Sequence, residues 1–136
     1  MKASIKLMIL LFLAVMNSQC NNGQTGKAKT DSNEVGLLKP VEFSKQSSQQ
    51  IVVDVRTPKE YNSGHIKEAI NIDFRDEGFT DEISKLKKDV PVFLYCRSGG
   101  RSGSAAKSLK KMGFKHVFDL EGGVLNWSKN NLELVK

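Results

Sequence analysis

A cysteine, two glycines and two arginines stand within seven consecutive residues, Cys96-Arg97-Ser98-Gly99-Gly100-Arg101-Ser102. A thiol ionises readily where fixed positive charge surrounds it, and the thiolate is a strong nucleophile. Glycines allow positive φ angles, so that successive backbone N–H groups can turn inward and bind an anion. The segment therefore predicts nucleophilic chemistry at Cys96 on an anionic substrate, which residues 97–102 would bind.

A single cysteine at the end of a strand is more often a small buried hydrophobic residue. For Cys96 that interpretation leaves the neighbouring glycines and arginines without a role. We therefore favour the catalytic interpretation, because five residues suited to anion binding meet in one short segment.

The elements on either side of this segment must hold it in place. Residues 91–95 are apolar and β-branched after an initial proline, and residues 51–55 have the same character. Both stretches predict central parallel strands that are buried on both faces. A helix is predicted over residues 102–112, where Ala105 and Leu109 recur at helical spacing and Gly113 would end it. Ligands in open α/β sheets bind at the carboxyl ends of strands, which is where Cys96 stands.

The rest of the chain continues this alternation. Shorter strands are predicted at residues 69–72 and 116–120, and further helices at residues 40–47, 81–87 and 123–130. Strands that alternate with helices give an α/β fold with a mostly parallel central sheet.

The cysteine segment resembles the active-site loop of single-domain rhodaneses, and three other segments resemble signatures of the same family. These are Asp54-Val55-Arg56-Thr57-Pro58-Lys59-Glu60-Tyr61, Gly64-His65-Ile66-Lys67-Glu68-Ala69-Ile70-Asn71-Ile72 and Leu120-Glu121-Gly122-Gly123-Val124-Leu125-Asn126-Trp127. One departure is Glu68, where the family usually has glycine. The resemblance implies a rhodanese-like sheet of about five strands flanked by helices on both faces.

The resemblance also implies a sulfurtransferase that needs no metal or organic cofactor. Cys96 would take sulfur from a small anionic donor such as thiosulfate, hold it as a persulfide, and pass it to a thiol or cyanide acceptor. Asp54 and Arg56 would form an ion pair that supports the loop. Arg97 and Arg101 would attract the donor, and Arg101 would also brace the loop.

Loop length separates this activity from that of a related class. Cys96 and Arg101 enclose four residues, whereas protein-tyrosine phosphatases have five between cysteine and arginine. By resemblance, the tighter loop fits a persulfide sulfur better than a phosphate, and sulfur transfer is favoured over phosphatase or arsenate reductase activity. Two alternatives stay open. One is a non-catalytic or sulfur-carrier module that binds a partner protein, and the other is a periplasmic thiol-redox protein.

The N-terminus predicts export. Lys2 and Lys6 precede ten apolar residues, 7–16, which are too few to span a bilayer but suit a secretory signal. Cys20 follows this run and resembles the lipidated cysteine of bacterial lipoproteins, with simple secretion as the alternative. We therefore expect a signal peptide over residues 1–20 and a periplasmic or cell-envelope protein. Its one membrane contact would be a lipid anchor at Cys20.

Residues 21–36 are polar and predict a flexible tether, which leaves residues 37–136 as one folded domain. Two cysteines cannot form a disulfide framework, and two histidines without a metal-binding spacing argue against a metal enzyme. Loss of Lys2 and Lys6 would lower the net charge from +6 to +4, which gives no reason to expect nucleic-acid binding. His65, Tyr95 and Trp127 are expected to have structural roles, and His116 to be exposed.

Overall fold

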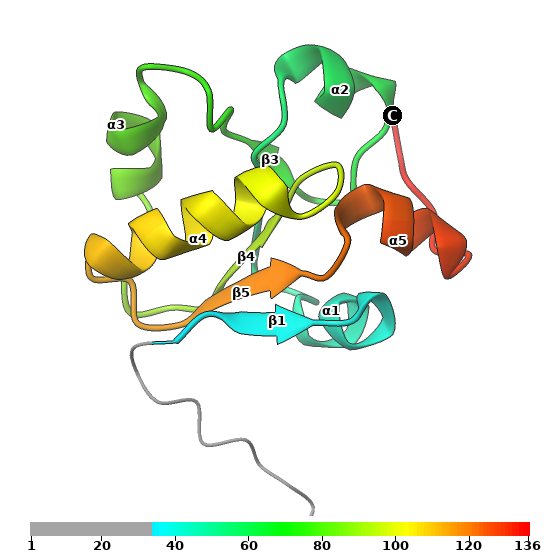
Figure 1. Ribbon diagram of the computed structural model, residues 1–136, viewed down its shortest axis with the longest axis horizontal. Helices are drawn as coiled ribbons and strands as arrows, with labels where there is room; N and C mark the ends of the chain where they lie inside the picture. The colour runs from blue at the N-terminus through cyan, green and yellow to red at the C-terminus, as the bar shows by residue number, and fades with distance from the viewer. Residues whose placement is uncertain (1–33) are drawn as a thin grey trace, which may run out of the picture.

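The computed structural model describes residues 34–136, in which five strands alternate with five helices (Figure 1). In chain order the elements are β1 (Gly36–Leu38), α1 (Pro40–Gln46), β2 (Ile51–Asp54), α2 (Pro58–Ser63), β3 (Ile70–Asn71), α3 (Phe79–Ser84), β4 (Val92–Tyr95), α4 (Gly100–Lys111), β5 (Val117–Leu120) and α5 (Gly123–Lys129). The predicted signal peptide, Cys20 and most of the predicted tether lie outside the described residues.

All five strands are parallel and follow the order β1-β5-β4-β2-β3. This arrangement confirms the predicted α/β fold. The two apolar runs chosen from the sequence form β2 and β4, which pair with each other near the middle of the sheet. Their carboxyl ends therefore lie side by side, and the segments that follow them meet at one edge.

Two elements were not predicted. β1 is only three residues long, includes the last residue of the predicted tether, and is recognisable only from its pairing with β5. α2 has six residues and buries none of them, so it has no apolar stripe. Its signal was a capping box, in which Thr57 and Glu60 exchange hydrogen bonds around a proline at the first helical position.

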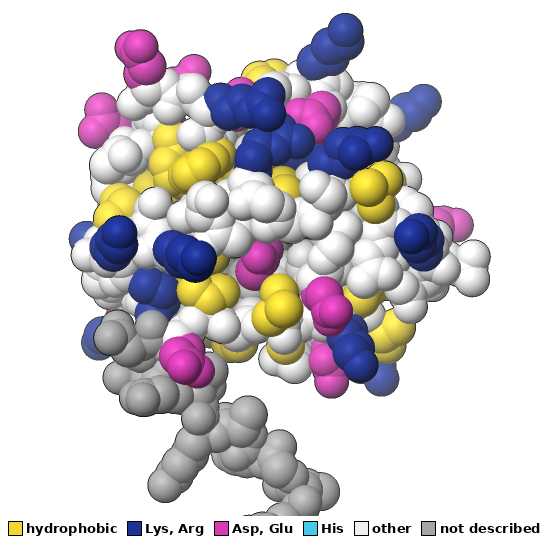
Figure 2. All heavy atoms as spheres, viewed as in Figure 1, with side chains coloured by type: hydrophobic (Ala, Val, Ile, Leu, Met, Phe, Trp, Pro, Cys, Tyr) yellow, Lys and Arg dark blue, Asp and Glu magenta, His cyan; other side chains and the backbone are white. Residues whose placement is uncertain are grey.

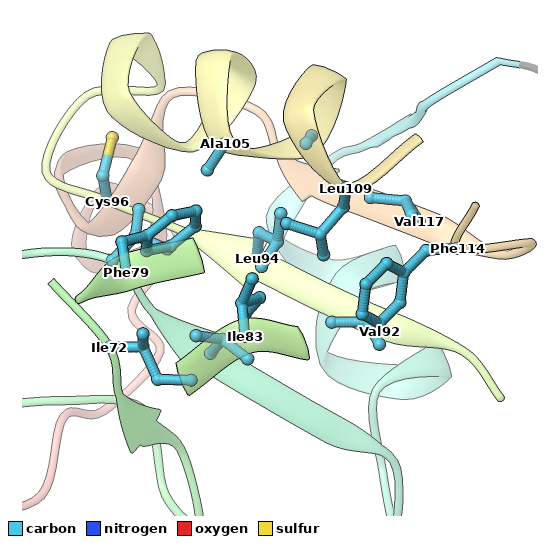
Figure 3. Close-up of a cluster of buried hydrophobic side chains, with 13 residues drawn as sticks. Ile72, Phe79, Ile83, Val92, Leu94, Cys96, Ala105, Leu109, Phe114 and Val117 are labelled. Atoms are coloured by element: carbon cyan, nitrogen blue, oxygen red, sulfur yellow. The ribbon is translucent and has the colours of Figure 1, made fainter. Parts of the chain in front are cut away.

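Helices cover both faces of the sheet, as predicted. On one face α3 and α4 pack Phe79, Ile83, Ala105 and Leu109 against β2, β4 and β5 (Figure 3). On the other face Phe43 of α1 meets Phe93 and Trp127 edge to face, with ring centroids 5.4 and 6.2 Å apart. Trp127 is thus part of the core, as expected.

His116 is exposed, also as expected. Within residues 34–136 no helix is long and apolar enough to cross a bilayer. The same part of the chain contains no cluster of three side chains suited to holding a metal ion.

Candidate active site

Cys96 lies directly after β4, and its side chain is only 1% exposed. Figure 3 shows its sulfur at the edge of the hydrophobic cluster, directed toward the α4 side of the sheet. The sulfur accepts hydrogen bonds from the Gly99 backbone N–H at 3.1 Å and from the Ser102 hydroxyl at 3.4 Å. Two donors therefore converge on the predicted nucleophile.

These contacts favour the thiolate. Burial raises the pKa of Cys96, because a charged sulfur is poorly solvated there. Hydrogen bonds from the Ser102 side chain and from the backbone of Ser102, Gly99 and Ser98 oppose this effect, and together they lower the pKa below its ordinary value. The site therefore holds a thiolate more easily than a free cysteine does.

The loop from Cys96 to Ser102, called here the cysteine loop, turns at a single glycine. Gly99 has a φ of 103°, a left-handed conformation that strongly favours glycine. Gly100 does not use the positive φ that glycine allows, because it is already the first residue of α4. The helix begins two residues earlier than predicted, so Arg101 and Ser102 lie in its first turn and its positive end faces the sulfur.

The first turn of α5 is hydrogen-bonded to the backbone of the cysteine loop. The Val124 and Leu125 N–H groups donate to the Cys96 and Arg97 carbonyls at 2.9 and 3.2 Å. A Cβ on Gly123 would lie 2.4 Å from the Cys96 carbonyl oxygen, so no larger residue fits there. In the sequence Gly123 stands only within a segment that resembles a family signature, and nothing there indicates its contact with the loop.

The two arginines have different surroundings. Arg97, the second residue of the cysteine loop, is exposed to solvent. Arg101 donates through both guanidinium arms to Glu60 of α2, at 2.8 and 2.7 Å. The bracing role that the resemblance implied for Arg101 therefore has a partner in α2, and its charge is partly neutralised. Figure 2 shows several Lys and Arg side chains gathered around an acidic side chain near the start of α4.

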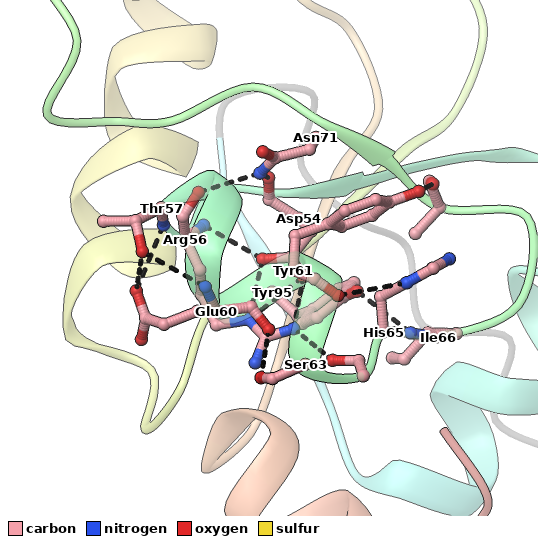
Figure 4. A network of polar contacts seen from close by, with 12 residues as sticks. Asp54, Arg56, Thr57, Glu60, Tyr61, Ser63, His65, Ile66, Asn71 and Tyr95 are labelled. Atoms are coloured by element: carbon pink, nitrogen blue, oxygen red, sulfur yellow. Dashed lines mark hydrogen bonds and ion pairs between the residues drawn. The ribbon is translucent and has the colours of Figure 1, made fainter. Parts of the chain in front are cut away.

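Asp54 and Arg56 form the expected buried ion pair, with Nη2 of Arg56 2.6 Å from Oδ2 of Asp54 (Figure 4). Arg56 also donates to the Gly64 carbonyl at 2.7 Å. Burial alone would lower the pKa of Arg56, but the hydrogen bond and charge of Asp54 raise it. Neither side chain is hydrogen-bonded to the Cys96 sulfur. Through the contact of Arg56 with the Gly64 carbonyl, the pair instead supports the segment between β2 and β3.

The neighbouring residues complete this support. The Tyr95 hydroxyl accepts a hydrogen bond from the Ile66 N–H at 3.0 Å, and its ring lies under Arg56. The His65 ring stacks on Tyr61, with centroids 3.8 Å apart. These contacts support the structural roles expected for Tyr95 and His65. Glu68, which replaces the usual glycine, has a φ of 66°, so the turn keeps the left-handed conformation without the residue that suits it best.

The fold and the site together define an α/β protein with a cysteine-containing loop at the carboxyl edge of a parallel sheet, and this loop stabilises the thiolate of its own cysteine. A family model for the Rhodanese-like domain matches residues 39–130, and the chain belongs to this family.

The relatives that match this chain are named for different functions. The tRNA uridine(34) hydroxylase of Pelagibacter ubique is 43% identical over 59% of this chain, but the match covers only 27% of that protein. The thiosulfate sulfurtransferase GlpE of Pseudomonas entomophila is 36% identical, over 57% of this chain and 69% of GlpE. A rhodanese-related protein from Thermoplasma volcanium superposes with a TM-score of 0.66 and 27% identity, covering 74% of this chain and 97% of that one.

Proposed function

We propose that this protein is a thiosulfate-type sulfurtransferase in which Cys96 carries the transferred sulfur. The observation that supports this most directly is the sulfur's environment, in which Gly99 and Ser102 donate to Cys96 Sγ and favour the thiolate. The same donors would stabilise the terminal anionic sulfur of a persulfide.

The proposed reaction has two displacements. The Cys96 thiolate attacks the outer sulfur of thiosulfate, a new S–S bond forms, and the S–S bond of thiosulfate breaks as sulfite leaves with the electron pair. Cyanide or a thiolate then attacks the outer sulfur of the persulfide. Thiocyanate or a new persulfide leaves, and the Cys96 thiolate is restored. Neither step needs an oxidant, a metal or an organic cofactor.

The arrangement of charge supports sulfur transfer over phosphate chemistry. Both arms of the Arg101 guanidinium donate to Glu60, so they are already occupied and are not available for a bidentate contact with a phosphate in the loop. Donor attraction is assigned to the exposed Arg97, to the loop N–H groups and to the positive end of α4.

The test uses the full chain with Cys20→Ser, in which Cys96 is the only thiol. Incubation with thiosulfate should add the mass of one sulfur atom, and cyanide should then remove it as thiocyanate. Cys96→Ser in the same background should do neither. A mass that does not change, with thiocyanate formation retained in Cys96→Ser, would refute the proposal. A stable persulfide that cyanide cannot remove would instead favour the sulfur-carrier alternative.

We further propose that the protein is exported and anchored in the cell envelope through an acylated Cys20. The support is the basic and apolar segment before Cys20 and the polar residues after it. Cys20→Ala should move the protein from the membrane fraction to the soluble fraction. Wild-type protein that is already soluble and cleaved at another residue would indicate simple secretion.

A further inference from the structure

Asp119 is a buried carboxylate that the proposed reaction does not use. It lies in β5 and is only 4% exposed, and its Oδ1 has no hydrogen-bond partner among residues 34–136. Val117, two residues earlier on the same face of the strand, packs in the cluster under α4. Burying an incompletely satisfied carboxylate is unfavourable, so this position calls for an explanation beyond packing.

The carboxylate lies against the first turn of α4. A Cβ on Gly103 would be 3.5 Å from Asp119 Oδ2. The preceding residue, Ser102, is fully buried, and its hydroxyl lies 3.4 Å from Cys96 Sγ and 3.4 Å from the Gly99 carbonyl. Asp119 and the Cys96 sulfur therefore both lie beside the first turn of α4, and Ser102 acts on the pKa of each of them.

The partners of Asp119 in the two neighbouring strands are apolar. In the sheet, β1 and β4 pair Leu37 and Leu94 with it. Burial raises the pKa of Asp119 to about 6, while hydrogen bonding from the Ser102 side chain and the Leu120 backbone acts in the opposite direction. Among the described residues, no charged side chain contributes to this pKa.

The Ser102 hydroxyl has one proton to donate and three acceptors near it: the sulfur, the Gly99 carbonyl and the Asp119 carboxylate. An ionised Asp119 only accepts, so it draws that proton away from the sulfur. A protonated Asp119 can itself donate to the Ser102 oxygen, which leaves the serine proton free for the thiolate.

We infer that Asp119 is a positioning residue for Cys96, and that its carboxyl decides whether the Ser102 proton is donated to the sulfur or drawn away from it. The inference rests on the proposed function only in assuming that the Cys96 thiolate is the working group. Its consequence is that the thiol is more acidic when Asp119 is neutral, because Ser102 then donates fully to the sulfur.

The experiment measures the pKa of Cys96 from the rate of iodoacetamide alkylation against pH and from thiolate absorbance. It uses the full chain with Cys20→Ser. Asp119→Asn and the apolar Asp119→Leu both remove the charged competitor, so each should lower the thiol pKa by about 0.5–1, the size expected for one net hydrogen bond. Glu121→Gln is the matched control, because it removes an equal charge just beyond the same strand, and it should leave the thiol pKa unchanged.

Ser102→Ala separates action through the hydroxyl from a direct effect of charge. It should raise the thiol pKa, and adding Asp119→Asn to it should then change nothing further. An unchanged thiol pKa in both Asp119 variants, or a shift that persists in the Ser102→Ala background, would overturn the inference. The readout does not depend on sulfur transfer: if the thiol pKa shifts as expected but no persulfide forms, the inference stands and the proposed function fails.

Discussion

The ion pair between Arg101 and Glu60 predicts different kinetic effects when either charge is removed. Arg101→Ala leaves a carboxylate unpaired beside the cysteine loop, whereas Glu60→Gln leaves a cation there. That carboxylate would repel the dianionic donor, and a repulsion of about 2 kcal/mol in the transition state corresponds to a fall of roughly 30-fold in kcat/KM for thiosulfate with Arg101→Ala. Arg97→Ala removes an exposed charge and should have a smaller effect, about 3- to 10-fold.

The double variant that combines Arg101→Ala with Glu60→Gln provides the control. Because Glu60→Gln removes the unpaired carboxylate, the double variant should recover part of the activity that Arg101→Ala loses. Glu60→Gln alone should stay within about threefold of wild type. Steady-state kinetics of thiocyanate formation compares wild type with all four variants. Equal losses in both single variants and in the double variant would mean that the pair is only a structural clamp, and the electrostatic reasoning would be wrong.

The same pair makes a stability prediction with a defined pH range. The Arg101 guanidinium, with a smaller contribution from Thr57, lowers the pKa of Glu60 from about 4.5 to about 2. The full shift corresponds to about 3 kcal/mol, but the pair is partly exposed, so solvent screening reduces the expected value to about 1 kcal/mol. Urea unfolding should show wild type more stable than Glu60→Gln above pH 4.5, and this difference should disappear as the pH falls toward about 2. If the stability difference between wild type and Glu60→Gln stays constant down to about pH 2, the low pKa of Glu60 is not due to this ion pair.

Three further predictions concern the cysteine loop. Gly123→Ala should destabilise the protein by about 2–3 kcal/mol in chemical denaturation, because its Cβ would meet the Cys96 carbonyl, whereas Gly100→Ala has open space and should be tolerated. A glycine inserted between Gly99 and Gly100 should abolish thiosulfate turnover by widening the loop, and retained turnover would remove the size argument against phosphatase activity. KM for thiosulfate should rise as salt increases from about 0.05 to about 0.5 M, since Arg97 attracts the donor through an exposed charge, and a KM independent of salt would argue against that role.

The features that sequence predicted well are those with a strong local pattern. The buried runs of β2 and β4 are continuous and apolar, and the cysteine loop gathers its chemistry in seven consecutive residues. Both can be recognised without knowing what lies next to them. The start of α4 was less certain, because Gly100 is a poor helix former and was assigned to the turn.

The features that sequence missed depend on residues far apart in the chain. Glu60 and Arg101 are 41 residues apart and meet only because α2 and α4 lie at the same edge of the sheet. The contact of Gly123 with the Cys96 carbonyl likewise needs β4 and β5 to pair. Asp119 is a charged residue within a short strand, where solvent exposure is the usual outcome. Only the position of α4 over β5 makes it a buried group.

The clamp between α5 and the cysteine loop also has a consequence for the order of folding. The loop carbonyls find their donors only after α5 has docked, and β1, the first strand, has its partner in β5, the last one. Contacts between distant parts of a chain form late, because closing the intervening loop must come first. In a chain synthesised from its N-terminus, we therefore expect the Cys96 and Arg97 carbonyls to lack these donors until α5 has been added. We expect the cysteine loop to reach its final, supported conformation in one of the last events of folding.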